Sequence, residues 1–196
     1  MTKIAVLNAD WLLNPGSGEP PQSNVSLIVN DGWIEAIGPK DELTIDDCER
    51  IDASGMVLIP GLINTHGHFL QTLTRALPAA QNSNVIEWQR LHQPLWEKIT
   101  PEALQSATRI AAAELLLGGC TTSMDHNYLW PNGCRVDDQV EVMQAMGMRF
   151  HIASELDEPV INQFHDPQPG SMVQVALAPR SPYSVSAESM RETASP

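Results

Sequence analysis

Hydrophobic residues in the first part of the chain come in short runs that turn-forming residues separate. These runs, rich in β-formers, occupy residues 4–7, 26–29, 33–37 and 55–60, and each predicts a β-strand. Asn30, Asp31 and Gly32 lie between the second and third runs, and these residue types tolerate the positive φ of a hairpin turn. The proline- and glycine-rich stretch 14–21 predicts a loop. We therefore expect a small β-sandwich portion over residues 1–58.

The pattern changes near residue 60 to apolar strands that alternate with helical segments. The predicted strands span 58–64, 121–125, 149–154 and 172–178, and the predicted helices 70–75, 85–99, 101–117 and 137–146. Thr100 and Pro101 suit a helix start, and Gly118 suits a helix end. Between the third and fourth strands, residues 155–171 leave room for a short helix at best.

Strands that alternate with helices predict a parallel sheet of βαβ units. Residues 59–196 have room for about four of the eight units of a (β/α)₈ barrel, which takes roughly 250 residues. We therefore expect an α/β fold in which 59–196 form the first half of a TIM-like barrel, with four strands, after the sandwich portion.

Composition narrows the function classes. Among the 196 residues, 11 Lys and Arg stand against 24 Asp and Glu, so the formal net charge is −13. This charge disfavours nucleic-acid binding and docking on anionic lipid, both of which need a basic surface. The sequence predicts no membrane span and no export signal. Three widely spaced cysteines without a CxxC pair indicate reduced thiols, as expected of a cytoplasmic protein.

The sharpest chemical signal is His66-Gly67-His68, at the end of the predicted strand 58–64. Side chains at i and i+2 of an extended segment point to the same side. Barrel enzymes place their active sites at the carboxyl ends of the strands, and neutral imidazole is a common ligand of divalent transition metals. His66 and His68 are therefore the predicted metal ligands.

The remaining histidines favour structural interpretations. His126 ends a predicted strand and is interpreted as a pocket-wall or structural residue, and His151, between Phe150 and Ile152, as a core histidine. His92 and His165 are predicted at surface or loop positions.

Four other polar or aromatic residues allow both structural and functional interpretations. Asp125 either accepts a hydrogen bond from a ligating histidine or caps a loop, and the sequence leaves both open. Trp88 and Trp96, eight residues apart on one helix, favour core packing over stacking on a ring, and Glu114 is predicted at the solvent edge of its helix. No phosphate loop, G-x-S-x-G motif or carboxylate pair is present.

The stretch Pro60-Gly-Leu-Ile-Asn-Thr-His-Gly-His68, after a β-rich segment, resembles the amidohydrolase superfamily. More narrowly, the chain is similar to its cytosine/purine-type aminohydrolases, the group that includes 8-oxoguanine deaminase and the triazine amino- and chlorohydrolases. Supporting stretches continue along nearly the whole chain, among them Gln71-Thr-Leu-Thr-Arg-Ala76, Gly119-Cys-Thr-Thr-Ser123 and Ala176-Leu-Ala-Pro179.

The resemblance implies one divalent metal ion, usually zinc, held by His66 and His68 with a third histidine and an aspartate from later strands. It also implies a metal-activated water that attacks the ring carbon bearing an amine, with a glutamate and a histidine moving protons. Gln71, at the glutamine of the HxHxxQ pattern, is implied to bind the heterocyclic substrate. No proton-transfer residue is identifiable in this chain.

Two departures from the family pattern bear on the function. The pattern stops after the fourth strand, and Arg180 stands where 8-oxoguanine deaminases carry a cysteine. We therefore expect a metal-dependent hydrolytic deaminase of a purine-like or triazine ring, present as an incomplete fragment. The alternatives are a chlorohydrolase, another cyclic-amide amidohydrolase, or an inactive truncated remnant. The unpaired strand edges of half a barrel predict self-association as a homo-oligomer.

Overall fold

The chain forms two compact units, Met1–Pro60 and Gly61–Pro196. The structure is a computed structural model, which describes residues 3–179 and 185–193. Among the described residues, no helix is long and apolar enough to cross a membrane.

The first unit contains a mixed five-stranded sheet of order β3-β2-β1-β4, with β5 also paired to β1. The strands are β1 (Ile4–Leu12), β2 (Gln22–Asn30), β3 (Trp33–Gly38), β4 (Glu49–Asp52) and β5 (Val57–Leu58). The predicted hairpin between β2 and β3 is confirmed, since Asp31 and Gly32 both have positive φ. The sequence analysis missed β4, because its residues are mostly polar and its pairing partner β1 lies more than forty positions away.

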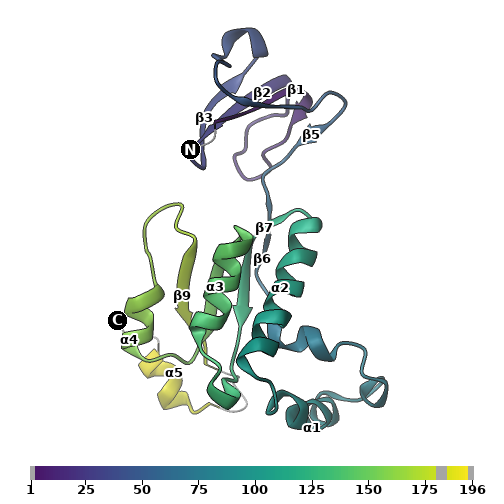
Figure 1. Cartoon of the computed structure of the whole chain (residues 1–196), viewed down its shortest axis with the longest axis vertical. Helices are drawn as coiled ribbons and strands as arrows, with labels where there is room; N and C mark the ends of the chain where they lie inside the picture. The colour runs from purple at the N-terminus through teal and green to yellow at the C-terminus, as the bar shows by residue number, and fades with distance from the viewer. Residues whose placement is uncertain (1–2, 180–184, 194–196) are drawn as a thin grey trace. The chain divides into compact units, whose positions relative to one another are not determined.

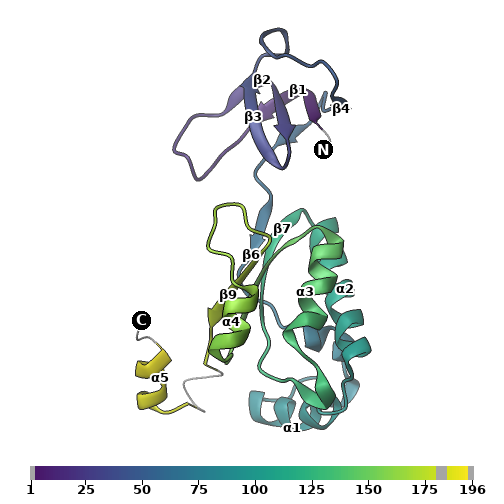
Figure 2. The ribbon, with the colours of Figure 1, turned by 60° about the vertical axis from the view of Figure 1, so that its left-hand side comes forward.

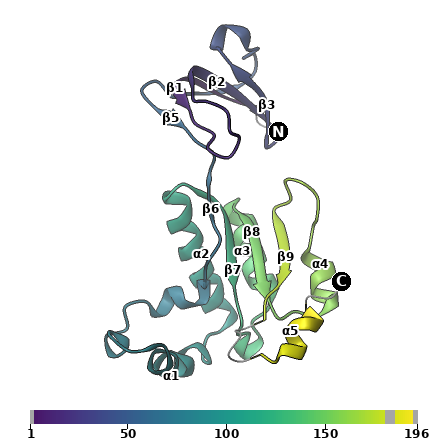
Figure 3. The same cartoon turned by 180° about the vertical axis from the view of Figure 1, so that it is seen from behind.

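The second unit has a parallel sheet of order β6-β7-β8-β9, which confirms the predicted alternation of strands and helices (Figures 1 and 3). The strands are β6 (Leu62–Asn64), β7 (Cys120–His126), β8 (Arg149–Ser154) and β9 (Val173–Leu177). The strand β6 is shorter than predicted, because Leu58 belongs to β5 of the first unit.

The helices are α1 (Val85–Trp96), α2 (Pro101–Leu117), α3 (Val136–Met146), α4 (Glu158–Phe164) and α5 (Ala187–Thr193). Thr100 caps α2 as predicted, with its side chain accepting a hydrogen bond from the Ala103 amide. The predicted helix at 70–75 is instead a 3₁₀ helix, η2 (Phe69–Thr74), and α1 ends at Trp96 rather than at residue 99.

Helices α2 and α3 pack side by side against one face of the parallel sheet (Figure 2). The small side chains of Ala111 and Ala112 on α2 are buried with Met143 on α3, and Phe150 and Ile152 on β8 are buried in the same cluster. This packing fixes β7 and β8 from one side. It leaves their carboxyl ends at the edge where the predicted histidines lie.

Candidate metal centre

His66 and His68 lie just beyond the carboxyl end of β6, as predicted. Their ring centroids are 5.1 Å apart and their ring planes are nearly perpendicular. Gly67 between them lies against β7, where an added Cβ would come within 2.6 Å of the Met124 carbonyl oxygen. A glycine is therefore required for the histidine segment to approach the neighbouring strand.

Strand β7 holds this segment through three consecutive contacts. The His126 amide donates to the Gly67 carbonyl oxygen at 2.8 Å. The His68 Nδ1 contacts the His126 carbonyl oxygen at 2.8 Å. The Phe69 amide donates to Asp125 Oδ1, also at 2.8 Å. Backbone on both sides of His68 is thus tied to one strand.

The contact at Nδ1 fixes the protonation of the half-buried His68 ring. A carbonyl oxygen only accepts, so Nδ1 carries the proton, and in the neutral ring Nε2 then carries the lone pair. Histidines that bind metals present this arrangement, with one ring nitrogen donating to a carbonyl or carboxylate. The residues present therefore fit a divalent cation at Nε2 of His68, with the His66 ring beside it.

His126 lies on the other side of His68, with its ring centroid 5.5 Å away. Its Nε2 is buried without a hydrogen-bond partner, while the Ala178 backbone hydrogen-bonds the ring. Burial lowers the pKa of His126, and the neighbouring charge of His68 lowers it further. The ring is therefore neutral at pH 7, and it contributes a wall of the candidate site.

Two imidazoles alone do not complete a metal site. Among residues 3–179 and 185–193, no group of three His, Cys, Asp or Glu side chains is arranged to hold a metal ion. Arg180, the departure noted in the sequence, lies outside the described residues.

Asp125 is fully buried at the end of β7. One carboxylate oxygen accepts from the Phe69 amide, and Oδ2 accepts from Gln139 Nε2 at 2.6 Å. Burial raises the pKa of Asp125 to about 7, although both hydrogen bonds favour the charged form. Of the two roles that the sequence left open, loop capping is the one present.

A buried polar network continues from Asp125 into the helix layer. Gln139 of α3 accepts from Asn127 Nδ2 and donates to Thr108 Oγ1 of α2, both at 3.3 Å. Thr108 in turn donates to the Leu104 carbonyl oxygen. The sequence analysis missed this network. The only available signal was the presence of polar residues on the apolar faces of predicted helices.

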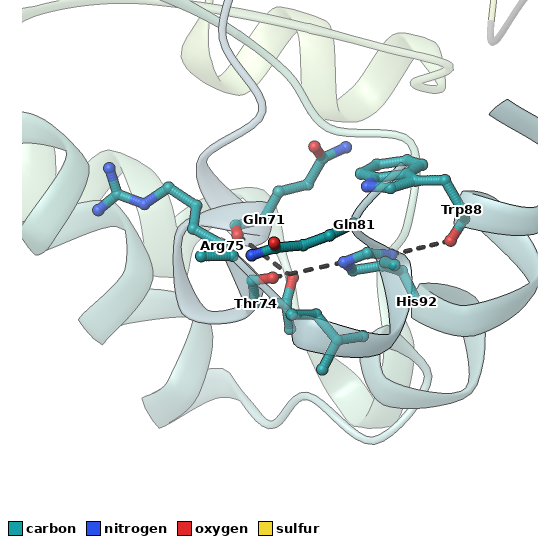
Figure 4. A pocket seen from close by; sticks show the side chains of 9 residues that line it. Gln71, Thr74, Arg75, Gln81, Trp88 and His92 are labelled. Carbon is teal, nitrogen blue, oxygen red and sulfur yellow. Dashed lines mark hydrogen bonds between the residues drawn. The ribbon is translucent and has the colours of Figure 1, made fainter. Parts of the chain in front are cut away.

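A pocket of about 260 Å³ adjoins η2 (Figure 4). It is lined by Gln71, Thr74, Arg75, Ala76, Leu77, Ala80, Gln81, Trp88 and His92. Gln71, the predicted substrate ligand, donates from Nε2 to the Tyr128 hydroxyl at 3.2 Å. The Tyr128 ring in turn lies 5.8 Å from the His68 ring. Gln71 therefore joins the pocket to the histidine cluster through Tyr128, which the sequence analysis missed.

The prediction that His92 lies at the surface is wrong, because its side chain is buried. It lies between Trp88 and Trp96, with ring centroids at 4.5 and 5.3 Å. Its Nδ1 contacts the Trp88 carbonyl oxygen at 2.8 Å. The three residues follow one another at spacings of four, so they share one face of α1. That spacing was the signal in the sequence.

The remaining residues singled out in the sequence differ in their exposure. His165 is exposed and His151 is half-buried. Burial lowers the pKa of His151. Glu114 is exposed as predicted, and it forms a 2.8 Å ion pair with Arg75. Trp96 is completely buried and the half-buried Trp88 packs against the same cluster, so the predicted core packing is confirmed for both.

The chain is similar in sequence to proteins of known family. The family model described as the amidohydrolase family matches residues 57–195. The 8-oxoguanine deaminase of Pseudomonas aeruginosa is 39% identical, over 96% of this chain and 49% of the relative. The hydroxydechloroatrazine ethylaminohydrolase of a Pseudomonas species is 29% identical, over 88% of this chain and 44% of the relative.

Solved structures show the same fold. The atrazine chlorohydrolase of Arthrobacter aurescens complexed with zinc superimposes with a TM-score of 0.78 at 24% identity, over 89% of this chain and 46% of that one. An adenosine deaminase from Xanthomonas campestris with bound zinc gives 0.75 at 20% identity, over 98% and 46%. The chain spans about half the length of the relatives it matches.

Proposed function

Because this chain belongs to the amidohydrolase family, we propose that it carries the metal-binding half of a hydrolytic deaminase acting on a purine-like ring. The 39% identity to an 8-oxoguanine deaminase supports a purine-like ring over other substrates. A triazine ring is the second candidate, and the 29% identity to a triazine aminohydrolase favours it.

One observation carries this proposal. The Nδ1 of His68 is committed to a backbone carbonyl, so Nε2 is left to bind a cation next to the His66 ring. Zinc is the proposed ion, since two structures of the same fold are described with zinc. A divalent metal held there would supply an activated water near neutral pH. A catalytic zinc has about three protein ligands, so the complete centre needs at least one beyond His66 and His68.

Gln71 and the pocket beside it are proposed to bind the heterocycle. The amide nitrogen of Gln71 is held by Tyr128, which orients its amide oxygen. The half-buried Trp88 offers an aromatic surface in the same pocket. The side chains at the pocket therefore combine a fixed polar group with a stacking surface, a combination that suits a flat polar ring.

The proposed architecture of the chain is the one expected for the amidohydrolase family. Residues 59–196 would form the first four strands of a (β/α)₈ barrel, and residues 1–58 a β-sandwich portion. Within residues 3–179 and 185–193, strands β6 and β9 end the order of the parallel sheet, and their unpaired edges support self-association. Cys48, Cys120 and Cys134 are unpaired, which supports a cytoplasmic location.

Zinc titration against a chromophoric chelator tests the proposal. We expect the 196-residue chain to bind about one zinc ion, and His66→Ala or His68→Ala to weaken binding at least about tenfold, since each removes a ligand. The exposed His165, changed to alanine, is the matched control. Equal affinity in all four proteins would contradict the proposal. Displacement of bound 8-oxoguanine by hydroxylated triazines then separates the two ring classes.

A further inference from the structure

We propose that Asp125 is a positioning residue of the metal centre, and that its buried carboxylate sets the orientation of His68 through the Phe69 amide. The inference rests on the proposed function, because it requires His66 and His68 to bind a cation. The hydrogen bonds of Asp125 go to the Phe69 amide and to Gln139, and neither reaches the ring of His66 or His68.

The carboxylate of Asp125 acts on the backbone that follows His68. Asp125 and His126 are consecutive on β7, and together they hold Gly67, His68 and Phe69. The carbonyl of His126 orients the His68 ring, while Asp125 fixes the peptide that follows it. A shift of the Phe69 amide would move the His68 backbone and weaken the Nδ1 contact that presents Nε2. The carboxylate therefore controls a ligand that it does not touch.

The hydrogen-bond partners around Asp125 require a carboxylate. Two N–H donors converge on Asp125, one from Phe69 and one from Gln139. An ionised carboxylate has only acceptors and satisfies both, whereas an asparagine would turn an NH₂ group toward one of them. Gln139 is not free to adapt, because Thr108 and Asn127 hold its amide. The network thus selects a carboxylate at position 125.

The burial of Asp125 has an energetic cost. A fully buried carboxylate is expensive unless it is paired. Among the described residues, no lysine, arginine or histidine forms an ion pair with Asp125. An apolar side chain of similar volume would leave the Phe69 and Gln139 donors buried without an acceptor. The carboxylate therefore holds the Phe69 amide next to His68 despite the cost of burying a charge.

Asp125→Asn tests the proposal, with zinc affinity measured on the full chain by chelator competition. The side chain keeps its size, and both histidines remain. We expect zinc to bind about 10- to 100-fold more weakly, the range for losing a partner of a metal ligand. Val140→Ala is the matched control, since it opens a cavity in the core cluster that also contains Phe69 but removes none of the hydrogen bonds of Asp125 or His68. We expect its zinc affinity to change less than about twofold, although the protein is destabilised.

Repeating the Asp125→Asn substitution in a His68→Ala chain separates positioning of His68 from a general loss of stability. In a His68→Ala chain, the residual zinc affinity should be the same with Asp125 or with asparagine, because the residue that Asp125 positions is gone. If Asp125→Asn does not fold by circular dichroism, Gln139→Met removes one of the two donors and is expected to weaken zinc binding about 3- to 10-fold.

The outcomes are distinguishable from those of the proposed function. A wild-type chain that binds no zinc would overturn the proposed function and this inference together. A wild-type chain that binds zinc, with affinity unchanged in Asp125→Asn and in Gln139→Met, would overturn only the positioning role. Equal weakening by Val140→Ala, or by Asp125→Asn in the His68→Ala background, would also overturn it.

Discussion

At the residue scale, Gly67 is the point where the histidine segment and β7 come closest. The sequence shows this glycine between two histidines, but the strand that requires it is not visible from local spacing. The obstacle is the Met124 main chain, 57 residues later, which side-chain rotation cannot relieve. Local spacing predicted the two ligands, whereas the reason for the glycine is a long-range contact.

Gly67→Ala tests this contact. The new Cβ would meet the Met124 carbonyl oxygen at 2.6 Å, so the segment must move away from β7. We expect a loss of about 1–3 kcal/mol in the free energy of unfolding, as for overpacked sites, together with weaker zinc binding. Urea unfolding and chelator competition measure both. Gly16→Ala, in open space, should change neither, and a Gly67→Ala chain with wild-type zinc affinity would refute the argument.

Asp125 also gives a pH prediction at this scale. Burial raises its folded-state pKa from 3.8 to about 7, so the folded chain binds more protons than the unfolded chain between these values. Stability contributed by this group is therefore present at low pH and is lost as pH rises from about 4 to about 7, by on the order of 4 kcal/mol.

Urea unfolding of the wild type and of Asp125→Asn between pH 4.5 and 8 checks the sign. Other carboxylates, such as Asp52 and Glu114, have lowered pKa values and act in the opposite direction in both proteins. The difference between the two curves isolates Asp125. We expect the wild type to lose stability relative to the variant as pH rises, and a flat or rising difference would contradict the raised pKa.

At the scale of elements, helices whose ends are set by neighbouring residues could be predicted. Elements whose conformation depends on residues distant in sequence could not. Thr100, Pro101 and Gly118 mark the ends of α2 because caps act within one turn of the helix. The predicted helix at 70–75 forms as the 3₁₀ helix η2, and α1 contacts it from outside its own sequence. Trp96 Nε1 donates to Thr74 Oγ1 at 3.0 Å, and Thr74 donates to the Gln71 carbonyl oxygen at 3.2 Å.

Trp96→Phe tests how α1 supports η2. The substitution keeps an aromatic ring but removes the donor to Thr74 and leaves some empty volume in the core. We expect a loss of about 1–3 kcal/mol in the free energy of unfolding. Trp88→Phe, at a half-buried position with its ring in the same cluster, should cost less. Urea denaturation of the two variants gives the comparison, and a larger loss for Trp88→Phe would reverse this assignment.

At the scale of the whole molecule, the parallel order of β6 to β9 followed from the strand–helix alternation, since βαβ units have few alternative topologies. The buried network around Asp125 could not be predicted in this way. It joins residues of η2, β7, α2 and α3, and such meetings depend on packing rather than on periodicity. The histidine pair was found because both residues lie within three positions of sequence.

The central claim is that His66 and His68 bind one cation through their imidazoles. X-ray absorption at the zinc edge, on the full chain loaded with one equivalent of zinc, tests it most directly. We expect imidazole nitrogens at about 2.0–2.1 Å in the wild type, and their loss when both histidines are changed to alanine. A zinc ion surrounded by oxygen alone in the wild type, or the same imidazole signal in the double variant, would contradict the account.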